Sequence, residues 1–216
     1  MEFSLNAGER QIDLSSPVCM GVINVTPDSF SDGLDLASKT SRQFSIDLDK
    51  ALFRAQSLLE DGACIVDVGG ESTRPGSSPV SIDEELHRVI PVIEAIKQNL
   101  DVCISVDTSS PVVMFEAISA GAELINDVRA FVNHDALELV AETEVALCLM
   151  HMQGQPSNMQ QSYKYADLLD DVLNFLLSRI KACVDAGVSE NRIVIDPGFG
   201  FGKSLKHNYK LLNELS

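Results

Sequence analysis

Short apolar segments alternate with longer segments of helical periodicity along the whole chain, and this alternation most limits the possible folds. Six such segments are rich in β-branched residues and lie at 19–25, 63–68, 102–106, 123–128, 145–150 and 192–195. They are continuously apolar, which is typical of strands covered on both faces. Strand–helix alternation of this kind predicts one parallel sheet with right-handed crossovers.

Helix boundary signals occur between the predicted strands. Ser81 and Glu84 have the spacing of a capping box, and Ser110 precedes a proline at the expected first helical position. Pro91 lies within a helical pattern, so we expect a kink or a restart there. A last helix is predicted to begin near Asn208.

The number of strand–helix units indicates a barrel. A closed (β/α)₈ barrel typically needs about 250 residues, whereas this chain has 216 residues and about six units. The predicted fold is therefore a TIM (β/α)₈-type barrel with an N-terminal hairpin that turns at Ala7–Gly8. We expect residues 1–216 to form a single domain that is incomplete at the C-terminus and lacks the last two βα units.

The net charge and the N-terminal sequence exclude some classes of binding partner. Lys and Arg total 16 and Asp and Glu total 32, so the net charge is −16. This balance argues against nucleic acid and against an anionic membrane surface, although a few local donors can still hold a phosphate. The N-terminus has no signal-peptide pattern, and no apolar stretch is long enough to span a bilayer.

The five cysteines are widely spaced within or beside apolar runs, and no C-x-x-C occurs among them. Their pattern favours buried, reduced thiols and a cytoplasmic location. No His, Cys and carboxylate spacing indicates zinc.

Polar residues follow the predicted strands, and in parallel α/β folds ligands bind beyond the carboxyl ends of strands. Three carboxylates and one amide share this placement: Asp67, Asp107, Asn126 and Asp196. A buried carboxylate needs a paired donor, and a ligand with two adjacent N–H groups supplies it. Asn126 both donates and accepts, which suits the edge of a heterocycle. For Asp107 alone, a helix cap is an equally good interpretation.

The loops after the first two strands are long and polar, which favours covers over a site rather than tight connectors. Arg74 is a natural partner for a phosphate or a carboxylate. Phe30 either anchors such a cover or contacts ligand. His151 is either a ligand or base, or a satisfied strand-end histidine, and the second interpretation is favoured. The GFGFGKS stretch fails the Walker A pattern because Pro197 stands where a glycine is required.

Taken in order, NVTPDSFSDG, DVGGESTRPGS, SVDT, INDVRA, LMHMQG and DPGFGFGK resemble the motifs of dihydropteroate synthases along essentially the whole chain. The resemblance implies transfer of a 6-hydroxymethyl-7,8-dihydropterin from its pyrophosphate to p-aminobenzoate in folate biosynthesis. It also implies Mg²⁺, a homodimer for the full-length protein and a sulfonamide target.

The resemblance further implies roles for individual residues. The pterin would be held by Asp107, Asn126, Met150 and Asp196, and the metal and pyrophosphate by Asn24. Catalytic roles fall to Asn24, Asp28 and Arg74. The covering loops and the p-aminobenzoate site would include Phe30, Ser31, Thr73, Pro75 and Phe201. The Ser-Arg-Lys and Arg-x-His stretches of the family do not occur in this sequence. We therefore expect the 216 residues alone to bind pterin weakly and to turn over slowly or not at all.

Two alternatives remain open. A pterin-binding methyltransferase domain shares the barrel and the Asp–Asn–Asp set, but it has no need of TPDSFSD or STRPGS. A non-catalytic remnant that binds pterin, or a partner chain, is the second alternative. Ordered binding of pterin pyrophosphate and p-aminobenzoate with Mg²⁺ would distinguish the synthase from both.

Overall fold

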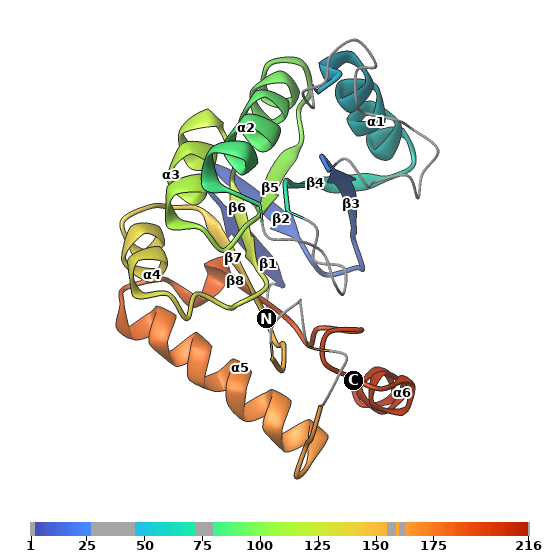
Figure 1. Cartoon of the computed structure of the whole chain (residues 1–216), viewed down its shortest axis with the longest axis vertical. Coiled ribbons are helices and arrows are strands. Elements are labelled where there is room, and N and C mark those ends of the chain that lie inside the picture. Colours follow the sequence, from blue (N-terminus) through green and yellow to red (C-terminus); the bar gives the residue numbers. More distant parts are fainter. Residues whose placement is uncertain (1–2, 27–45, 72–79, 155–158, 160–162, 216) are drawn as a thin grey trace.

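Residues 3–26, 46–71, 80–154, 159 and 163–215 are described by the structure, a computed structural model. Their core is a six-stranded parallel sheet with the order β3-β4-β5-β6-β7-β8, in which each strand pairs with the next one along the chain (Figure 1). The strands are β3 (Cys19–Asn24), β4 (Ala63–Gly69), β5 (Cys103–Asp107), β6 (Leu124–Asp127), β7 (Ala146–Met150) and β8 (Ile193–Asp196). These bounds confirm the six predicted strands to within two residues.

Helices follow the strands and cover the outer face of the curved sheet (Figure 1). They are α1 (Leu48–Glu60), α2 (Ile82–Asn99), α3 (Pro111–Ala120), α4 (His134–Ala141), α5 (Leu168–Asp185) and α6 (Leu205–Asn213), with a short 3₁₀ helix η2 (Glu190–Arg192) before β8. The predicted (β/α)-barrel architecture with six units is confirmed. Within the described residues β8 and β3 do not pair, so these two strands are the edges of the sheet.

Two helix expectations need correction. Helix α2 runs unbroken through Pro91, so the expected restart is wrong. The residue four positions earlier, His87, is exposed, and its carbonyl can therefore bond water in place of the missing N–H. Helix α6 begins at Leu205 rather than near Asn208, because Ser204 caps it and the side chain of His207 completes the capping box. A histidine at this position is not the Glu or Gln that defines the usual pattern.

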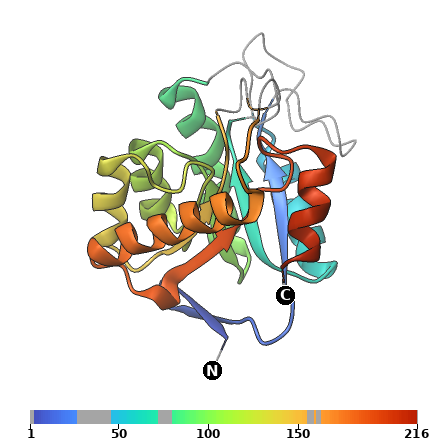
Figure 2. The same ribbon diagram turned by 90° about the horizontal axis from the view of Figure 1, so that it is seen from below.

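The predicted N-terminal hairpin is present as β1 (Ser4–Ala7) paired antiparallel with β2 (Arg10–Asp13). Because Ala7 pairs with Arg10, the turn residues are Gly8 and Glu9, one position later than expected. Gly8 has a φ of 60°, which glycine adopts without strain. The hairpin lies at the end of the sheet opposite to the carboxyl ends of the strands (Figure 2).

Apolar side chains form two cores, one on each face of the sheet. The larger lies between sheet and helices and includes Val66, Ile104 and Leu147. The smaller fills the concave inner face near the hairpin, where Leu5 packs with Leu124 and other residues. This inner core forms an apolar layer below the polar side chains at the carboxyl ends of the strands.

All five thiols are free. Cys103, Cys148 and Cys183 are buried and Cys64 is partly buried, but Cys19 is exposed. The expectation of burial is therefore wrong for Cys19, which lies at the start of edge strand β3. Among the described residues, no helix is both long and apolar enough to cross a membrane.

Candidate active site

A lateral row of polar side chains crosses four neighbouring strands at their carboxyl ends. Asn24 of β3 is level with Gly69 of β4, Gly69 with Asp107 of β5, and Asp107 with Asn126 of β6. Neighbouring strands lie about 4.8 Å apart. The three polar side chains therefore stand along one short line, although they come from distant parts of the sequence.

Gly69 leaves space in the middle of this row. A Cβ atom placed on Gly69 would lie 3.6 Å from the Asn24 Oδ1 and 3.8 Å from the Asp107 Oδ2. The two oxygens thus face the same small volume above the glycine. A side chain at position 69 would occupy the space that a ligand needs to reach both of them.

The Asp107 carboxylate is the least satisfied polar group in the row. Burial raises its pKa well above the ordinary value, and the nearby charges of Asp67, Asp127, Glu85 and Glu71 raise it further. Among the described residues, none donates a hydrogen bond to this carboxylate. The alternative role as a helix cap is not supported, since Ser110 is the N-cap of α3. An acceptor of this kind is suited to a ligand that brings its own N–H donors.

Asp67 lies below the row and fixes the orientation of Asn126. The Asn126 Nδ2 donates to the Asp67 Oδ2 at 3.1 Å, and the Ser105 hydroxyl donates to the Asp67 Oδ1. Burial raises the pKa of Asp67, and these two hydrogen bonds partly offset the effect. Because its amide nitrogen is engaged, Asn126 presents its Oδ1 as a free acceptor. Sequence reasoning noted Asp67 at the rim but did not include it among the site residues.

Asp127, the neighbour of Asn126, points away from the row and holds the following turn. Its carboxylate accepts from the backbone N–H of Arg129 at 2.9 Å and of Phe131 at 2.7 Å, and from the Ser109 hydroxyl. Burial raises the pKa of Asp127, against the effect of these bonds. Ala130 and Phe131 both have positive φ, so the turn needs this support. The INDVRA motif therefore contains one site candidate and one structural carboxylate.

Met150 of β7 and Asp196 of β8 are neighbours in the strand register. They lie further toward the carboxyl ends than the row, because Asn126 is level with Cys148 of β7. Asp196 accepts from the Gly198 backbone N–H through its Oδ1 at 2.6 Å. Its second oxygen is left for another donor. Met150 is buried, and Phe201 follows in a partly exposed turn after β8.

His151 is a satisfied strand-end residue, as the favoured interpretation predicted. Its Nδ1 lies 3.0 Å from the Nζ of Lys203, and its ring contacts Phe175 edge to face at 5.1 Å. Burial, with the charge of Lys203, lowers the pKa of His151 to about 4, so the imidazole is neutral at pH 7. Neither residue resembles a free base.

Six predicted site residues lie outside the described residues and have no structural account: Asp28, Phe30, Ser31, Thr73, Arg74 and Pro75. The remaining six, Asn24, Asp107, Asn126, Met150, Asp196 and Phe201, all lie at the carboxyl ends of neighbouring strands or in the turn after β8.

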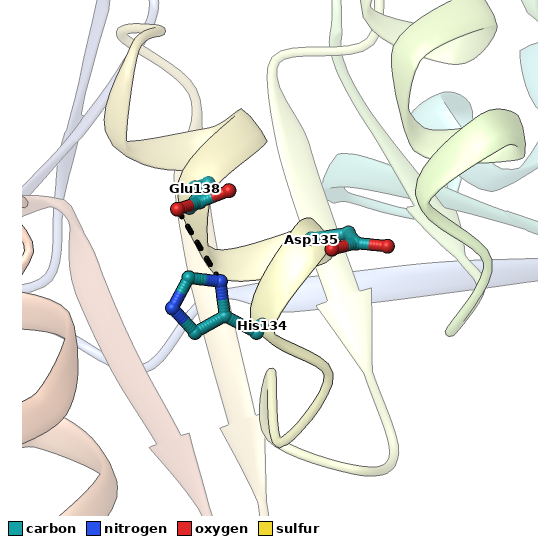
Figure 3. A group of neighbouring side chains, drawn as sticks. All are labelled: His134, Asp135 and Glu138. Atoms are coloured by element: carbon teal, nitrogen blue, oxygen red, sulfur yellow. Dashed lines mark ion pairs between the residues drawn. The ribbon is translucent and has the colours of Figure 1, made fainter.

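One group of possible metal ligands lies elsewhere, on the surface of α4. His134, Asp135 and Glu138 are exposed, and the His134 Nδ1 lies 3.3 Å from the Glu138 Oε1 (Figure 3). This is the ordinary spacing of an i, i+4 pair on a helix. The arrangement carries no sign of a ligand.

A parallel (β/α) barrel with polar side chains at its strand ends belongs to the class of barrel enzymes whose active sites lie at this face. Residues 20–216 match the family described as pterin binding enzyme. The dihydropteroate synthases of Haemophilus influenzae and Escherichia coli K12 are each 50% identical to this chain over 212 residues. The matches cover 98% of this chain and 74% and 72% of the two relatives, respectively.

Solved structures give the same result. A Yersinia pestis dihydropteroate synthase in a sulfonamide drug complex superimposes with a TM-score of 0.88 at 51% identity, covering 98% of this chain and 74% of that one. The chain belongs to the pterin binding enzyme family and, within it, to the dihydropteroate synthases. The resemblance of the six motifs is thereby confirmed.

Proposed function

We propose that this protein condenses 6-hydroxymethyl-7,8-dihydropterin pyrophosphate with p-aminobenzoate, giving 7,8-dihydropteroate and pyrophosphate. The observation that carries this assignment is the row of Asn24, Asp107 and Asn126 across four strands of a barrel from this family. One solved relative, from Burkholderia cenocepacia, is a complex with 7,8-dihydropteroate; it is 42% identical to this chain. The step belongs to folate biosynthesis and is a transferase reaction.

The unsatisfied acceptors of the row match the polar edge of a pterin. That edge offers a ring N–H and an exocyclic amine side by side, and a carboxylate accepts two such donors at once. Asp107 supplies a carboxylate without a described donor, and Asn126 supplies a free Oδ1. Asp196 has one oxygen left beyond its bond to Gly198. Met150 lies beside Asp196 in the register and would line the face of the ring.

Asn24 fits a Mg²⁺ ion that is held largely by the pyrophosphate. Magnesium prefers oxygen ligands, keeps several waters and often takes only one or two protein ligands beside substrate phosphates. Asn24 offers one amide oxygen at an exposed edge of the acidic rim. When bound there, Mg²⁺ would stabilise the charge on the departing pyrophosphate.

The loop residues complete the proposed site. Arg74 would hold the pyrophosphate or the carboxylate of p-aminobenzoate, with Thr73 and Pro75 in the same loop. Asp28, Phe30 and Ser31 would belong to the second covering loop. Phe201 would flank the p-aminobenzoate ring. These roles follow from the family motifs.

The chemistry asks little of nucleophilic side chains. The pterin ring donates electron density toward its methylene carbon as the C–O bond to pyrophosphate breaks. The neutral amine of p-aminobenzoate then forms the C–N bond and loses a proton. The rim residues orient the pterin, and exclusion of water prevents hydrolysis of the cation-like centre.

Calorimetric titration separates this proposal from its alternatives. We expect p-aminobenzoate to bind only after pterin pyrophosphate, or pterin with pyrophosphate, and to need Mg²⁺. Metal-independent binding of a methylfolate would favour the pterin-binding methyltransferase. Pterin binding that neither requires pyrophosphate nor creates a p-aminobenzoate site would favour a non-catalytic remnant.

Pterin binding should release protons. The pKa of Asp107 is raised in the folded, ligand-free protein. At a pH between the ordinary pKa and the raised one, the folded protein therefore holds a proton that the unfolded chain has lost. As pH rises through this window, the free energy of unfolding decreases. A ligand that donates N–H bonds favours the ionised carboxylate and lowers the pKa again. Titration of 6-hydroxymethylpterin, which lacks ionising phosphates, in pairs of buffers that differ in ionisation enthalpy should show net proton release at pH values from about 5 to 7. Proton uptake over this range would contradict the role of Asp107.

Assembly and location are further parts of the proposal. The apolar, exposed side chains of α6, among them Leu205, Tyr209 and Leu212, support a homodimer contact. Sedimentation velocity with the aspartate substitutions Leu205→Asp and Leu212→Asp tests this contact. The five free thiols support a cytoplasmic location, where thiols remain reduced.

A further inference from the structure

Lys203 is buried, and its ammonium group joins the loops that follow β7 and β8. The Nζ lies 3.1 Å from the carbonyl oxygen of His151, 2.9 Å from that of Gly198 and 3.0 Å from that of Phe201. The fourth contact is the Nδ1 of His151 at 3.0 Å. We call these three carbonyls the lysine cage. Only 3% of Lys203 is exposed, so solvent cannot replace these contacts.

Charge and tautomer can be assigned from these contacts. Burial lowers the pKa of Lys203 to about 8, so the side chain is still charged at pH 7. An ammonium group only donates, and His151 is neutral there, so the His151 Nδ1 must accept. The ring proton of His151 is therefore on Nε2. Carbonyl oxygens and one imidazole nitrogen together compensate the buried charge.

The lysine cage fixes the turn that carries Phe201. The Phe201 backbone N–H donates to the Gly198 oxygen at 3.1 Å, so residues 198–201 form a tight turn, and Lys203 bonds the carbonyl at each end of it. Two of the turn's amides are also held by side chains, since the Gly200 N–H donates to the Asn208 Oδ1 at 2.9 Å and the Gly198 N–H to the Asp196 Oδ1 at 2.6 Å, but Lys203 is the donor to its carbonyls. Asp196, by contrast, is part of β8, where its carbonyl accepts from the His151 N–H at 2.9 Å.

The two loops also meet backbone to backbone. A Cβ on Gly198 would lie 2.0 Å from the His151 oxygen, and one on Gly202 would lie 2.5 Å from the Gln153 oxygen. A second link is the Tyr165 hydroxyl, which donates to the Gly202 oxygen at 2.8 Å. Lys203 thus lies at the centre of a contact that only glycines permit.

We infer that Lys203 is a positioning residue that locks the turn of Phe201 against the strand end of Met150 and His151, and so shapes the p-aminobenzoate side of the site. The inference rests on the proposed function for the identity of the ligand. The lock itself is a property of the fold and can be tested without any ligand. Lys203 does not touch the reacting atoms in this account.

Hydrogen exchange measures the lock directly. In Lys203→Met, the amides of the segment 197–203, in which every residue except Pro197 has an exchangeable N–H, should exchange at least roughly 10-fold faster, because the turn loses its central donor. Peptides from β7, residues 146–150, should keep their protection. The control Lys206→Met changes an exposed lysine three residues away and should alter neither region. Unchanged exchange at 197–203, or equal acceleration in both regions, would overturn the inference.

Binding measurements test the consequence for the site. In Lys203→Met, p-aminobenzoate should bind roughly 10-fold more weakly to protein loaded with 6-hydroxymethylpterin, pyrophosphate and Mg²⁺. The pterin itself should lose no more than about 3-fold, because Asp107 and Asn126 lie on other strands. A merely destabilised protein would weaken both ligands alike, and that result counts against a positioning role.

Tyr165→Phe covers the case in which Lys203→Met does not fold. It removes the second link between the same loops and leaves the lysine cage filled. We expect the same selective loss for p-aminobenzoate and the same local exchange, both smaller. Tyr165→Phe with wild-type exchange at 197–203 would contradict the lock. If the wild-type protein binds neither ligand, the proposed function fails, while the exchange comparison still decides on the lock.

Discussion

Asp107→Asn should weaken pterin binding by roughly 100-fold or more, with little loss of folded structure. The amide keeps the shape of the carboxylate but presents an N–H to the donor edge of the ligand, so one charge-assisted interaction is lost and a repulsive contact replaces it. Calorimetric titration with 6-hydroxymethylpterin measures this change. Asp135→Asn, on the exposed surface of α4, is the matched control and should bind as the wild type does.

The same variant should be as thermally stable as the wild type or more stable. Asp107 is partly buried near Asp67 and Asp127, and its desolvation and their charges raise its pKa, so an amide escapes both costs. Opposite effects on binding and stability identify a residue retained for its ligand rather than for folding. A variant that lost stability and binding together would place Asp107 in the structural framework.

The second large effect concerns stability. Asp127→Ala should destabilise the protein by roughly 3 kcal/mol, because two backbone N–H groups and the Ser109 hydroxyl lose their acceptor. In a domain of this size such a loss lowers Tm by roughly 6–12 °C. Chemical and thermal denaturation measure it.

Two comparisons make the interpretation specific. Asp170→Ala, an exposed position in the first turn of α5, should change Tm by much less. Asp127→Asn keeps one acceptor oxygen and should lie between the alanine variant and the wild type. If alanine at 127 were tolerated, the turn through Ala130 and Phe131 would need another source of support. Arg179, which donates to the carbonyls of both residues, would be that source.

Local sequence signals predicted the strands and the polar residues at their ends. Each continuous apolar run that ends in polar residues predicted a strand with a polar carboxyl end. This pattern placed Asp107, Asn126 and Asp196 in the candidate site, because the end of a strand can be identified from its own residues. Successive side chains of a strand point to opposite faces of the sheet. The sequence Asn126-Asp127 alone could not predict which of the two faces inward. This depends on the register with β5 and β7.

Contacts between distant segments were beyond sequence reasoning. Asp67 and Asn126 are 59 positions apart, and Lys203 and His151 are 52 apart, so neither pair has a local pattern. Lys203 was considered only as part of GFGFGKS, a stretch that fails the Walker A pattern at Pro197. The early start of α6 was missed because a histidine completes its capping box.

The row across β3, β4, β5 and β6 has a thermodynamic consequence. Asn24, Asp107 and Asn126 come together only when all four strands have paired, so the recognition surface is absent from any intermediate in which one of these strands is unpaired. A bound pterin therefore stabilises the pairing of strands that are distant from one another in the sequence. Each tenfold increase in free ligand above its Kd should add about 1.4 kcal/mol to the resistance of the entire sheet to unfolding.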